Sequence, residues 1–367
     1  MNPCDQLLVQ ALNETNSNRL WIADENISPQ LISQIHFQVQ AQIHDQIPGQ
    51  TLGQPLLQAI TNRADIGSAL LTRNIATEIN DFDFSSLGSF EQIIYRVSKE
   101  RILVQHCINQ AFNHLPNGGK LILLGEKSDG IKTHGKFAED LFSSKISIEK
   151  NGRCYLAQVI KNRETKHPRK QSRTQALGNY HELQIFEQDG LNFYSKPGLY
   201  GWKKIDVGSR LLIETIEPIL STINTKELSL LDLGCGYGYL TLMIARAEFK
   251  HLWATDNNVA AILAAEKNFA LHNLPVTLNL DDCGKNIHRH FEIIVCNPPF
   301  HQGFAHDSSL LQKFVSQSLA LLSPHGIAFF VVNEFVPLQQ AAKQLHCDIN
   351  LLAHMQGFKV FKLTRRR

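Results

Sequence analysis

Apolar stretches of strand length recur along the chain, separated by turns and by segments with a helical pattern. In the second half, Phe291–Cys296 is almost wholly apolar, and the Pro-Gly turn Leu321–Gly326 and the apolar run Ile327–Val332 follow it. Short apolar runs bounded by turn residues are typical of buried strands. The order predicts a strand, a crossover helix and a second, parallel strand.

The first half repeats this order. There Phe90–Tyr95 is followed by a helical stretch, by the turn Leu115–Gly119 and by the apolar run Leu121–Leu124. Alternation of strands and helices predicts an α/β fold with a parallel sheet, and its repetition predicts a duplication. We therefore expect two tandem Rossmann-like domains, over residues 1–185 and 186–367.

The bulk composition agrees with two globular domains. The chain has 367 residues, of which 43% are hydrophobic and 19% charged, and a formal net charge of +2. It shows neither a membrane-spanning apolar run nor the basic and apolar flank of a secretory signal, so we expect a cytoplasmic protein. The seven cysteines form no Cys-x-x-Cys pair, which predicts reduced thiols and no metal site.

A glycine-rich segment follows the apolar run Leu230–Leu233. Gly234, Gly236 and Gly238 stand at alternate positions before an apolar helical pattern. Glycine permits a tight turn and close approach of a ligand to the backbone, and the helix N-terminus favours an anion. The anion could be a dinucleotide pyrophosphate or a cofactor carboxylate, and in the second case Asp232 can face the cofactor's ammonium group.

Acidic residues at the ends of the next two strands help to choose between these cofactors. The run Leu252–Thr255 ends at Asp256, whose carboxylate can accept hydrogen bonds from ribose hydroxyls, as in nicotinamide enzymes too. A further pair, Asp281 and Asp282, follows the third strand, and Asp282 is placed to accept a bond from an adenine amine. Either acid alone could be an ordinary turn residue. The whole series favours S-adenosylmethionine.

The tetrapeptide Asn297-Pro298-Pro299-Phe300 follows the strand Phe291–Cys296 directly. Ligands of open α/β sheets bind beyond the carboxyl ends of the strands, so it should lie beside the cofactor. The Asn297 side-chain oxygen and the Pro298 carbonyl can each accept one hydrogen of a substrate amine, and the prolines stiffen the loop. Phe300 offers a face on which an extruded base can stack. Asn-Pro is also a common turn starter, but the preceding motifs favour catalysis.

The first half lacks these groups. After its strand Phe90–Tyr95 comes Arg96-Val97-Ser98, without an Asn-Pro pair, and its first strand, Arg19–Glu25, leads into no glycine loop. We expect a degenerate methyltransferase-like domain without a working site.

With these motifs the chain resembles the family of bacterial ribosomal RNA small subunit methyltransferase C, and its large-subunit relative G. The resemblance covers essentially the whole chain and includes Lys204–Ser209, Asn333 and Gly357–Lys362. Pro197–Tyr200 and His301–Gly303 favour the small-subunit enzyme. The ending Arg365–Arg367 is typical of the large-subunit one, and Trp202-Lys203-Lys204 departs from the family's usual cofactor-pocket edge.

The resemblance implies S-adenosylmethionine-dependent methylation of the N2 amine of one guanine in 16S rRNA of the small ribosomal subunit, guanine 1207. It implies target-base roles for Asn297, Pro298, Pro299 and Phe300, with Asp206 and Gly208 near the cofactor. The cofactor residues it implies are Asp232, Gly234, Gly236, Gly238, Asp256 and Asp282. It also implies a first domain that helps to hold RNA, no metal, no membrane, and a monomer.

Three other functions compete with this one. A glutamine-N5 methyltransferase shares Asn-Pro-Pro but typically continues with Tyr and has a small helical first domain. An inactive RNA-binding assembly factor would not need Asn297 and Asp256. A nicotinamide dehydrogenase would need hydride-transfer residues that do not follow the glycine turn.

Two basic segments are candidate RNA contacts. Residues 161–173 contain six cations and one carboxylate, and the chain ends in Arg365–Arg367. Such runs bind phosphates in some proteins and are solvated loops in others, and the sequence leaves both readings open.

Overall fold

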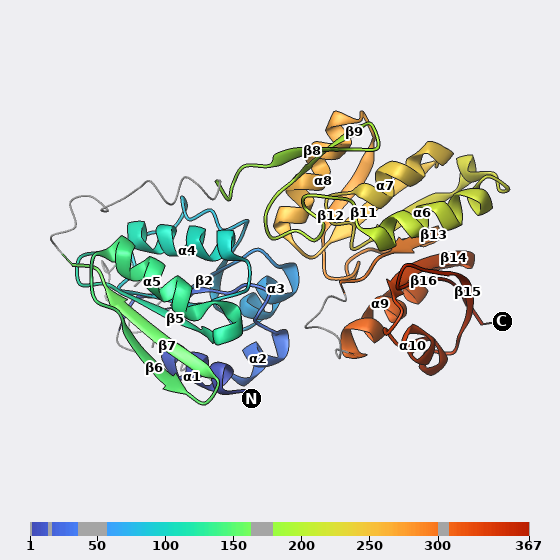
Figure 1. Cartoon of the computed structure of the whole chain (residues 1–367). Coiled ribbons are helices and arrows are strands. Elements are labelled where there is room, and N and C mark those ends of the chain that lie inside the picture. The colour runs from blue at the N-terminus through green and yellow to red at the C-terminus, as the bar shows by residue number, and fades with distance from the viewer. Residues whose placement is uncertain (1, 14–16, 36–56, 163–178, 300–307, 367) are drawn as a thin grey trace, which may run out of the picture. The chain divides into compact units, whose positions relative to one another are not determined.

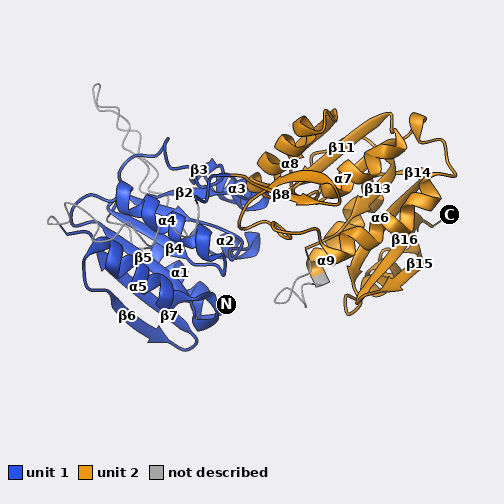
Figure 2. Cartoon of the chain, turned by 45° about the horizontal axis from the view of Figure 1, so that its top comes forward, with its two compact units in different colours: residues 1–182 blue, residues 183–367 orange. Residues whose placement is uncertain are grey.

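The computed structural model describes residues 2–13, 17–35, 57–162, 179–299 and 308–366. By its internal contacts the chain divides into two compact units, Met1–Glu182 and Leu183–Arg367 (Figure 2). Among the described helices, none combines the length and the apolar character needed to cross a bilayer.

Unit 1 is built around one seven-stranded sheet of order β3-β2-β1-β4-β5-β7-β6 (Figure 1). Its elements are α1 (Pro3–Leu12), β1 (Arg19–Ile22), α2 (Pro29–Gln34), β2 (Leu57–Thr61), α3 (Ala64–Thr72), β3 (Ala76–Ile79), β4 (Gln92–Arg96), α4 (Arg101–His114), β5 (Lys120–Glu126), η1 (Lys127–Asp129), α5 (Ile131–Phe142), β6 (Ser147–Asn151) and β7 (Cys154–Ile160). Strands β1 to β5 are parallel, whereas β7 runs antiparallel to both β5 and β6.

Unit 2 repeats the sheet with the order β12-β11-β10-β13-β14-β16-β15 and adds the hairpin β8-β9. Its elements are β8 (Gln184–Gln188), β9 (Leu191–Ser195), α6 (Val207–Leu220), η4 (Thr225–Glu227), β10 (Ser229–Leu233), α7 (Tyr239–Ile244), η5 (Ala245–Ala247), β11 (His251–Asp256), α8 (Val259–Leu271), β12 (Val276–Leu280), β13 (Phe291–Cys296), α9 (Ser308–Leu321), β14 (Leu322–Asn333), α10 (Leu338–Gln344), β15 (Cys347–Met355) and β16 (Phe358–Arg365). The predicted fold class, two tandem Rossmann-like α/β domains, is confirmed.

The central strands of each sheet are buried on both faces, because their successive residues point into different cores. In unit 1, Leu20 and Ile22 pack with α4 and α5, whereas Trp21 packs with α1, α2 and α3. In unit 2, Leu230 packs with α6, α7 and α8, whereas Leu231 packs with α9 and α10. Burial on both sides explains why the strands read as continuous apolar runs.

Equivalent hydrogen bonds occur in the two units just after β1 and just after β10, the first strand of each parallel sheet. Ala23 N donates to Ile60 O at 2.9 Å, and Gly234 N donates to Thr255 O at 2.8 Å. Leu20 pairs with Ile93 just as Leu231 pairs with Ile294.

Asn80 N likewise donates to Thr61 O, as Asp281 N does to Asp256 O. In this correspondence the functional positions of unit 2 have the following counterparts in unit 1: Asp232 has Trp21, Gly234 has Ala23, Asp256 has Thr61 and Asn297 has Arg96. The expectation that the first domain lacks the site groups therefore holds in three dimensions.

Two expectations were wrong. The predicted turn at Leu321–Gly326 lies largely inside β14, which begins at Leu322 and meets β13 through a register shift between Phe291 and Ile293. Cys4 and Cys154 form a disulfide across 150 residues, and the other five cysteines are free and buried. The pair was invisible in the sequence because only the packing of α1 against β7 brings the two thiols together.

Candidate functional site

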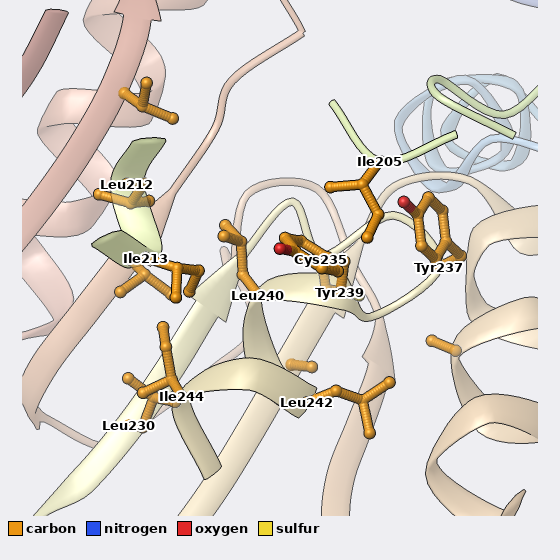
Figure 3. Packing of buried hydrophobic residues seen from close by; sticks show 14 of the residues in the cluster. Ile205, Leu212, Ile213, Leu230, Cys235, Tyr237, Tyr239, Leu240, Leu242 and Ile244 are labelled. Carbon is orange, nitrogen blue, oxygen red and sulfur yellow. The ribbon is translucent and has the colours of Figure 1, made fainter. Parts of the chain in front are cut away.

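The glycine-rich loop after β10 adopts a backbone that requires glycine. Gly234, Gly236 and Gly238 have φ angles of 84°, 56° and 90°, in the left-handed region. Gly234 N and Cys235 N both donate to Thr255 O, at 2.8 and 2.9 Å, and this anchors the loop to β11. Beside the loop, Cys235, Tyr237 and Tyr239 belong to the hydrophobic cluster of unit 2 (Figure 3).

The loop has room for a ligand at one glycine and none at another. A Cβ built on Gly236 would meet no atom within 4 Å, whereas one on Gly238 would lie 2.7 Å from Phe269 Cε1. Gly236 thus borders open space, and Gly238 is required by the packing of the loop on α8. The backbone at Gly236 can be approached closely, as a nucleoside cofactor requires.

Asp232, in β10 just before the loop, is bonded to Thr241 of α7 just after it. Its side chain is fully buried, and its Oδ2 accepts hydrogen bonds from Thr241 N at 3.0 Å and Thr241 Oγ1 at 2.7 Å. Its Oδ1 is buried without a partner among the described residues. Burial, aided by the nearby charge of Asp256, raises the pKa of Asp232 to about 7. An unpaired buried acceptor at this place fits a cationic group, such as the ammonium that the sequence predicted.

Asp256, at the end of β11, holds the loop from the other side. Its Oδ2 accepts from Gly236 N and its Oδ1 from Asn258 N, both at 2.9 Å. A carboxylate oxygen has two lone pairs and can accept more than one hydrogen bond. The predicted contact with ribose hydroxyls is compatible with this geometry.

The acidic pair after β12 divides into two roles. Asp281 is buried and accepts from Asp282 N, Asn286 N and Asn286 Nδ2, so it shapes the turn. Asp282 forms an ion pair with Lys313 of α9, and about a fifth of its side chain is exposed. Of the two, only Asp282 faces outward enough to bind an adenine amine.

Asn297 leaves β13 next to β10, on the edge of the sheet where the glycine loop lies. Its side-chain Nδ2 donates to Asp206 Oδ2 and to Ser209 Oγ, both at 2.8 Å. Neither its Oδ1 nor the Pro298 carbonyl oxygen accepts a hydrogen bond from another described residue. Among the described residues, these two oxygens are thus acceptors without a donor at consecutive positions of the chain.

Asp206 and Gly208 belong to the start of α6. Asp206 caps the helix, because its Oδ2 accepts from Ser209 N at 2.9 Å, and its Oδ1 accepts from Tyr200 OH at 2.7 Å. A Cβ on Gly208 would lie 2.8 Å from Phe358 Cδ1, so this glycine allows close packing of α6 on β16. The structure places Asp206 against Asn297, a contact that the sequence did not indicate.

Sequence reasoning missed four residues of this site: Tyr200, Ser209, Thr241 and Lys313. Ser209 lies in the Asp-Val-Gly-Ser segment singled out by the resemblance, and three residues after an Asp it could have been read as part of a helix cap. No local signal marks Thr241 or Lys313.

Several predicted contacts lie wholly or partly outside the described residues. Phe300, His301–Gly303, Arg367 and most of the basic run 161–173 are among them. Of that run, Lys161 donates through Nζ to Phe112 O and Leu115 O at 2.6 and 2.8 Å, so it closes the end of α4. Arg365 donates to Ala320 O at 3.3 Å. Lys161 and Arg365 thus each bind backbone carbonyl oxygens of the protein itself.

A cavity of about 340 Å³ lies elsewhere in unit 2, between the C-terminal parts of α6 and α7. Its lining includes Leu220, Thr225 and Ile244, which lie toward the amino end of β10. It contains none of the predicted site residues, so it is separate from the site at the carboxyl edge. Among the described residues no group of three His, Cys, Asp or Glu is arranged to hold a metal ion.

Family models match both units. Residues 190–362 match the methyltransferase small domain, and residues 29–175 match the methyltransferase small domain N-terminal model.

Two curated relatives of the chain are both named ribosomal RNA small subunit methyltransferase C. The chain is 25% identical over 279 residues to ribosomal RNA small subunit methyltransferase C of Shewanella piezotolerans, covering 76% of this chain and 78% of the relative. It is 26% identical over 288 residues to the protein of that name from Haemophilus influenzae, covering 77% and 82%. The resemblance noted in the sequence is confirmed.

Among solved structures, the T. thermophilus 16S rRNA guanine-1207 N2-methyltransferase, in complex with AdoMet and guanosine, aligns with a TM-score of 0.78. The alignment covers 100% of this chain and 92% of that one, at 22% identity, and supports the fold. Residues 29–175 and 190–362 thus match the N-terminal and the C-terminal module of the methyltransferase small domain, in that order.

Proposed function

We propose that the chain transfers a methyl group from S-adenosylmethionine to the N2 amine of one guanine in 16S rRNA of the small ribosomal subunit. The observation that carries this proposal is the state of Asn297. Both of its amide hydrogens point to protein acceptors, and its oxygen remains as an acceptor beside the Pro298 carbonyl. The named relatives, which are rRNA methyltransferases, support the substrate class, and guanine 1207 is the position proposed by similarity.

The chemistry of the target amine explains why two acceptors are needed. The lone pair of an amine attached to a purine ring is delocalised into the ring, so the nitrogen is a weak nucleophile. Hydrogen bonds from its two hydrogens to Asn297 Oδ1 and the Pro298 carbonyl favour a pyramidal nitrogen and aim its lone pair. When bound, S-adenosylmethionine supplies an electrophilic methyl group on a sulfonium sulfur. As the C–N bond forms, the bond between the methyl group and the sulfonium sulfur would break and leave a neutral thioether, and the methylated amine would release one proton to water.

The chain's own residues fit that cofactor at three points. The open side of Gly236 would accommodate the methionine part, and the buried Asp232 Oδ1 would accept from its ammonium group. The Asp256 carboxylate would accept from the ribose, and Asp282 would accept from the adenine amine while Lys313 holds it in place. The open glycine and the unpartnered oxygen are the observations that make the fit specific.

A guanine in a duplex hides its N2 amine in base pairing and in the minor groove. The base must therefore leave the stack before Asn297 can reach it, and Phe300 is the proposed stacking partner. The pocket alone cannot select one guanine among many. We propose that unit 1 and the basic segments 161–173 and 365–367 supply the wider RNA surface, and that the protein acts as a monomer in the cytoplasm.

One described aromatic residue is placed to assist. Phe335 follows β14, which pairs in parallel with β13, so it lies on the same edge of the sheet as Asn297. Its side chain is 85% exposed, and Lys359 Nζ binds the carbonyl of the preceding residue at 2.9 Å. An exposed aromatic ring is a suitable platform for an unpaired base.

The test is methyl transfer from radiolabelled cofactor to small ribosomal subunits that lack the modification. We expect one methyl group per particle, mapped by primer extension to a single guanine, and transfer at least about a hundredfold slower with the Asn297→Ala variant. Large subunits and a translation release factor serve as alternative substrates. Transfer to a protein glutamine, or to the large subunit alone, would refute the proposal.

A further inference from the structure

We propose that Asp206 and Ser209 are positioning residues that fix the orientation of the Asn297 carboxamide, so that its oxygen and not its nitrogen meets the substrate amine. This inference rests on the proposed function and deepens it. A carboxamide is planar, and its two ends are nearly equal in size. Without fixed partners it could turn over and present N–H groups to an incoming amine, which would repel it.

The partners of Asn297 exclude the turned-over form. Nδ2 has two hydrogens, and each has an acceptor at 2.8 Å, one on Asp206 and one on Ser209. An ionised carboxylate accepts hydrogen bonds and cannot donate them. The opposite orientation would place the Asn297 oxygen against Asp206 Oδ2, and neither oxygen could donate a hydrogen bond to the other.

Asp206 is itself held in place from two sides. Its Oδ2 accepts from Ser209 N at 2.9 Å, and its Oδ1 accepts from Tyr200 OH at 2.7 Å. Burial and the carboxylate of Asp206 hold the pKa of Tyr200 well above its usual range, so the phenol remains a donor. The contacts run from Tyr200 through Asp206 to Asn297 and fix its amide.

Unit 1 contains the same triangle of positions without an amide. Asn2 caps α1 by accepting from Asp5 N at 2.9 Å, just as Asp206 caps α6 by accepting from Ser209 N. The Asp5 carboxylate in turn pairs with Arg96, the counterpart of Asn297. The fold therefore brings the helix cap to the strand end in both units, and only unit 2 uses this contact to orient an amide.

The Ser209→Ala variant removes one of the two acceptors and leaves the helix cap intact. We expect kcat for small subunits to fall by about tenfold, while the cofactor Kd stays within about twofold of the wild-type value, because the loss belongs to the chemical step. Wild-type kcat in this variant would overturn the inference. So would a loss of cofactor affinity that accounts for the whole loss of activity.

Exchange of the two partners gives a sharper readout. Asn297→Asp places two carboxylates side by side and should abolish turnover. In the double variant Asp206→Asn with Asn297→Asp, the amide nitrogen at 206 donates to the carboxylate at 297, whose second oxygen can again accept from the amine. The hydrogen bond from Ser209 N to Asp206 Oδ2 is lost in this variant. We expect the double variant to recover at least about tenfold in kcat over Asn297→Asp, a coupling that independent sites do not show. Failure to recover, in a double variant as thermally stable as the single one, would contradict the inference.

The matched control is Asp5→Ala, which breaks the corresponding contact in unit 1. It should lower the melting temperature and leave single-turnover methyl transfer unchanged. A readout without RNA keeps the inference distinct from the proposed function. In protein labelled with ¹⁵N-asparagine, the side-chain signal that disappears in Asn297→Ala should shift in Ser209→Ala. If it shifts while the wild type methylates no RNA, only the proposed function fails, whereas an unmoved signal refutes the positioning role.

Discussion

Single residues of the site both hydrogen-bond to the protein and are proposed to contact a ligand, because each side chain has few atoms and many neighbours. Asp256 anchors Gly236 and Asn258 with the two oxygens proposed to bind ribose. Asn297 is fixed through its nitrogen so that its oxygen can act. A substitution at such a residue therefore separates binding from chemistry only when the remaining contacts survive.

Asn297→Ala is expected to leave cofactor affinity nearly unchanged and to lower kcat by at least about a hundredfold, the usual scale for a lost transition-state acceptor. The reason is that its oxygen interacts with the amine most strongly as the lone pair develops. Calorimetry with S-adenosylmethionine and single-turnover transfer measure the two quantities. An equal loss of both would mark Asn297 as a structural residue of the loop.

Asp232→Asn is expected to flatten the dependence of stability on pH. The folded-state pKa of Asp232 is raised from 3.8 to about 7 by burial, so the folded protein holds a proton that the unfolded chain releases. The stabilisation from this proton is present in full below pH 4 and is lost as the pH rises toward 7. If the whole shift is expressed, the difference in unfolding free energy between wild type and variant changes by about 4 kcal/mol across that window.

Denaturant unfolding of both proteins between pH 4 and pH 8 measures this change. Equal slopes of unfolding free energy against pH in the two proteins would show that Asp232 is ionised throughout.

At the scale of elements, the segment formed by β10, the glycine loop and α7 contains glycines that are needed for two different reasons. One is required because the chain packs against a neighbour, and the other borders open space. The sequence shows both as the same letter in the same pattern, and the distinction arises only from what lies opposite each Cα atom.

Gly238→Ala and Gly236→Ala should therefore have contrasting effects. The first forces a Cβ against Phe269 and should lower the free energy of unfolding by about 2 to 4 kcal/mol. The second meets no atom and should cost only about 1 to 2 kcal/mol, for the left-handed backbone alone. In Gly236→Ala we nevertheless expect cofactor binding to weaken at least tenfold. Unaltered cofactor affinity in that variant would place the ligand elsewhere.

The whole molecule contains two sheets of one topology, of which one retains the site. Trp21, Ala23, Thr61 and Arg96 of unit 1 stand at the positions of Asp232, Gly234, Asp256 and Asn297 of unit 2. In addition, the Cys4–Cys154 disulfide stands where Gly208 and Phe358 pack in unit 2. Unit 1 has the same sheet as unit 2, and at these positions it has a disulfide and an ion pair between Arg96 and Asp5 in place of the proposed site residues.

One cofactor should therefore bind per chain. Titration with S-adenosylmethionine in a calorimeter should give a stoichiometry near one. Asp256→Ala should weaken the binding free energy of the cofactor by about 1 to 3 kcal/mol, because a charged acceptor is lost. Thr61→Ala is the matched control in unit 1 and should leave the affinity unchanged. Two equivalent sites would contradict the account of unit 1 as degenerate.

Activity on ribosomal particles should also fall steeply with added salt, because contacts to RNA phosphates release counterions. Methyl transfer measured from low to moderate salt, with cofactor binding as the control, gives the slope. Free guanosine should not be methylated. Efficient methylation of short unstructured RNA would argue against selection by a wide RNA surface.

The sequence alone determined the features that depend on neighbours along the chain. The apolar runs at Phe291–Cys296 and Phe90–Tyr95, the glycine turn and the Asn-Pro-Pro segment were recognisable because strands, tight turns and stiff loops are local structures. The repetition of their order also revealed the duplicated α/β fold. The roles of the individual site residues remain predictions, and Phe300 lies outside the described residues.

Only the tertiary structure decided which distant residues meet. The contact of Asn297 with Asp206 spans 91 residues and the disulfide spans 150, and no local pattern reveals either. Likewise, β14 runs through the expected turn at Leu321–Gly326, because pairing of Leu322 with Phe291 of β13 outweighs the turn preference of its proline and glycine. Side-chain chemistry is set by the sequence, but burial, pairing and orientation depend on what the folded chain places opposite each group.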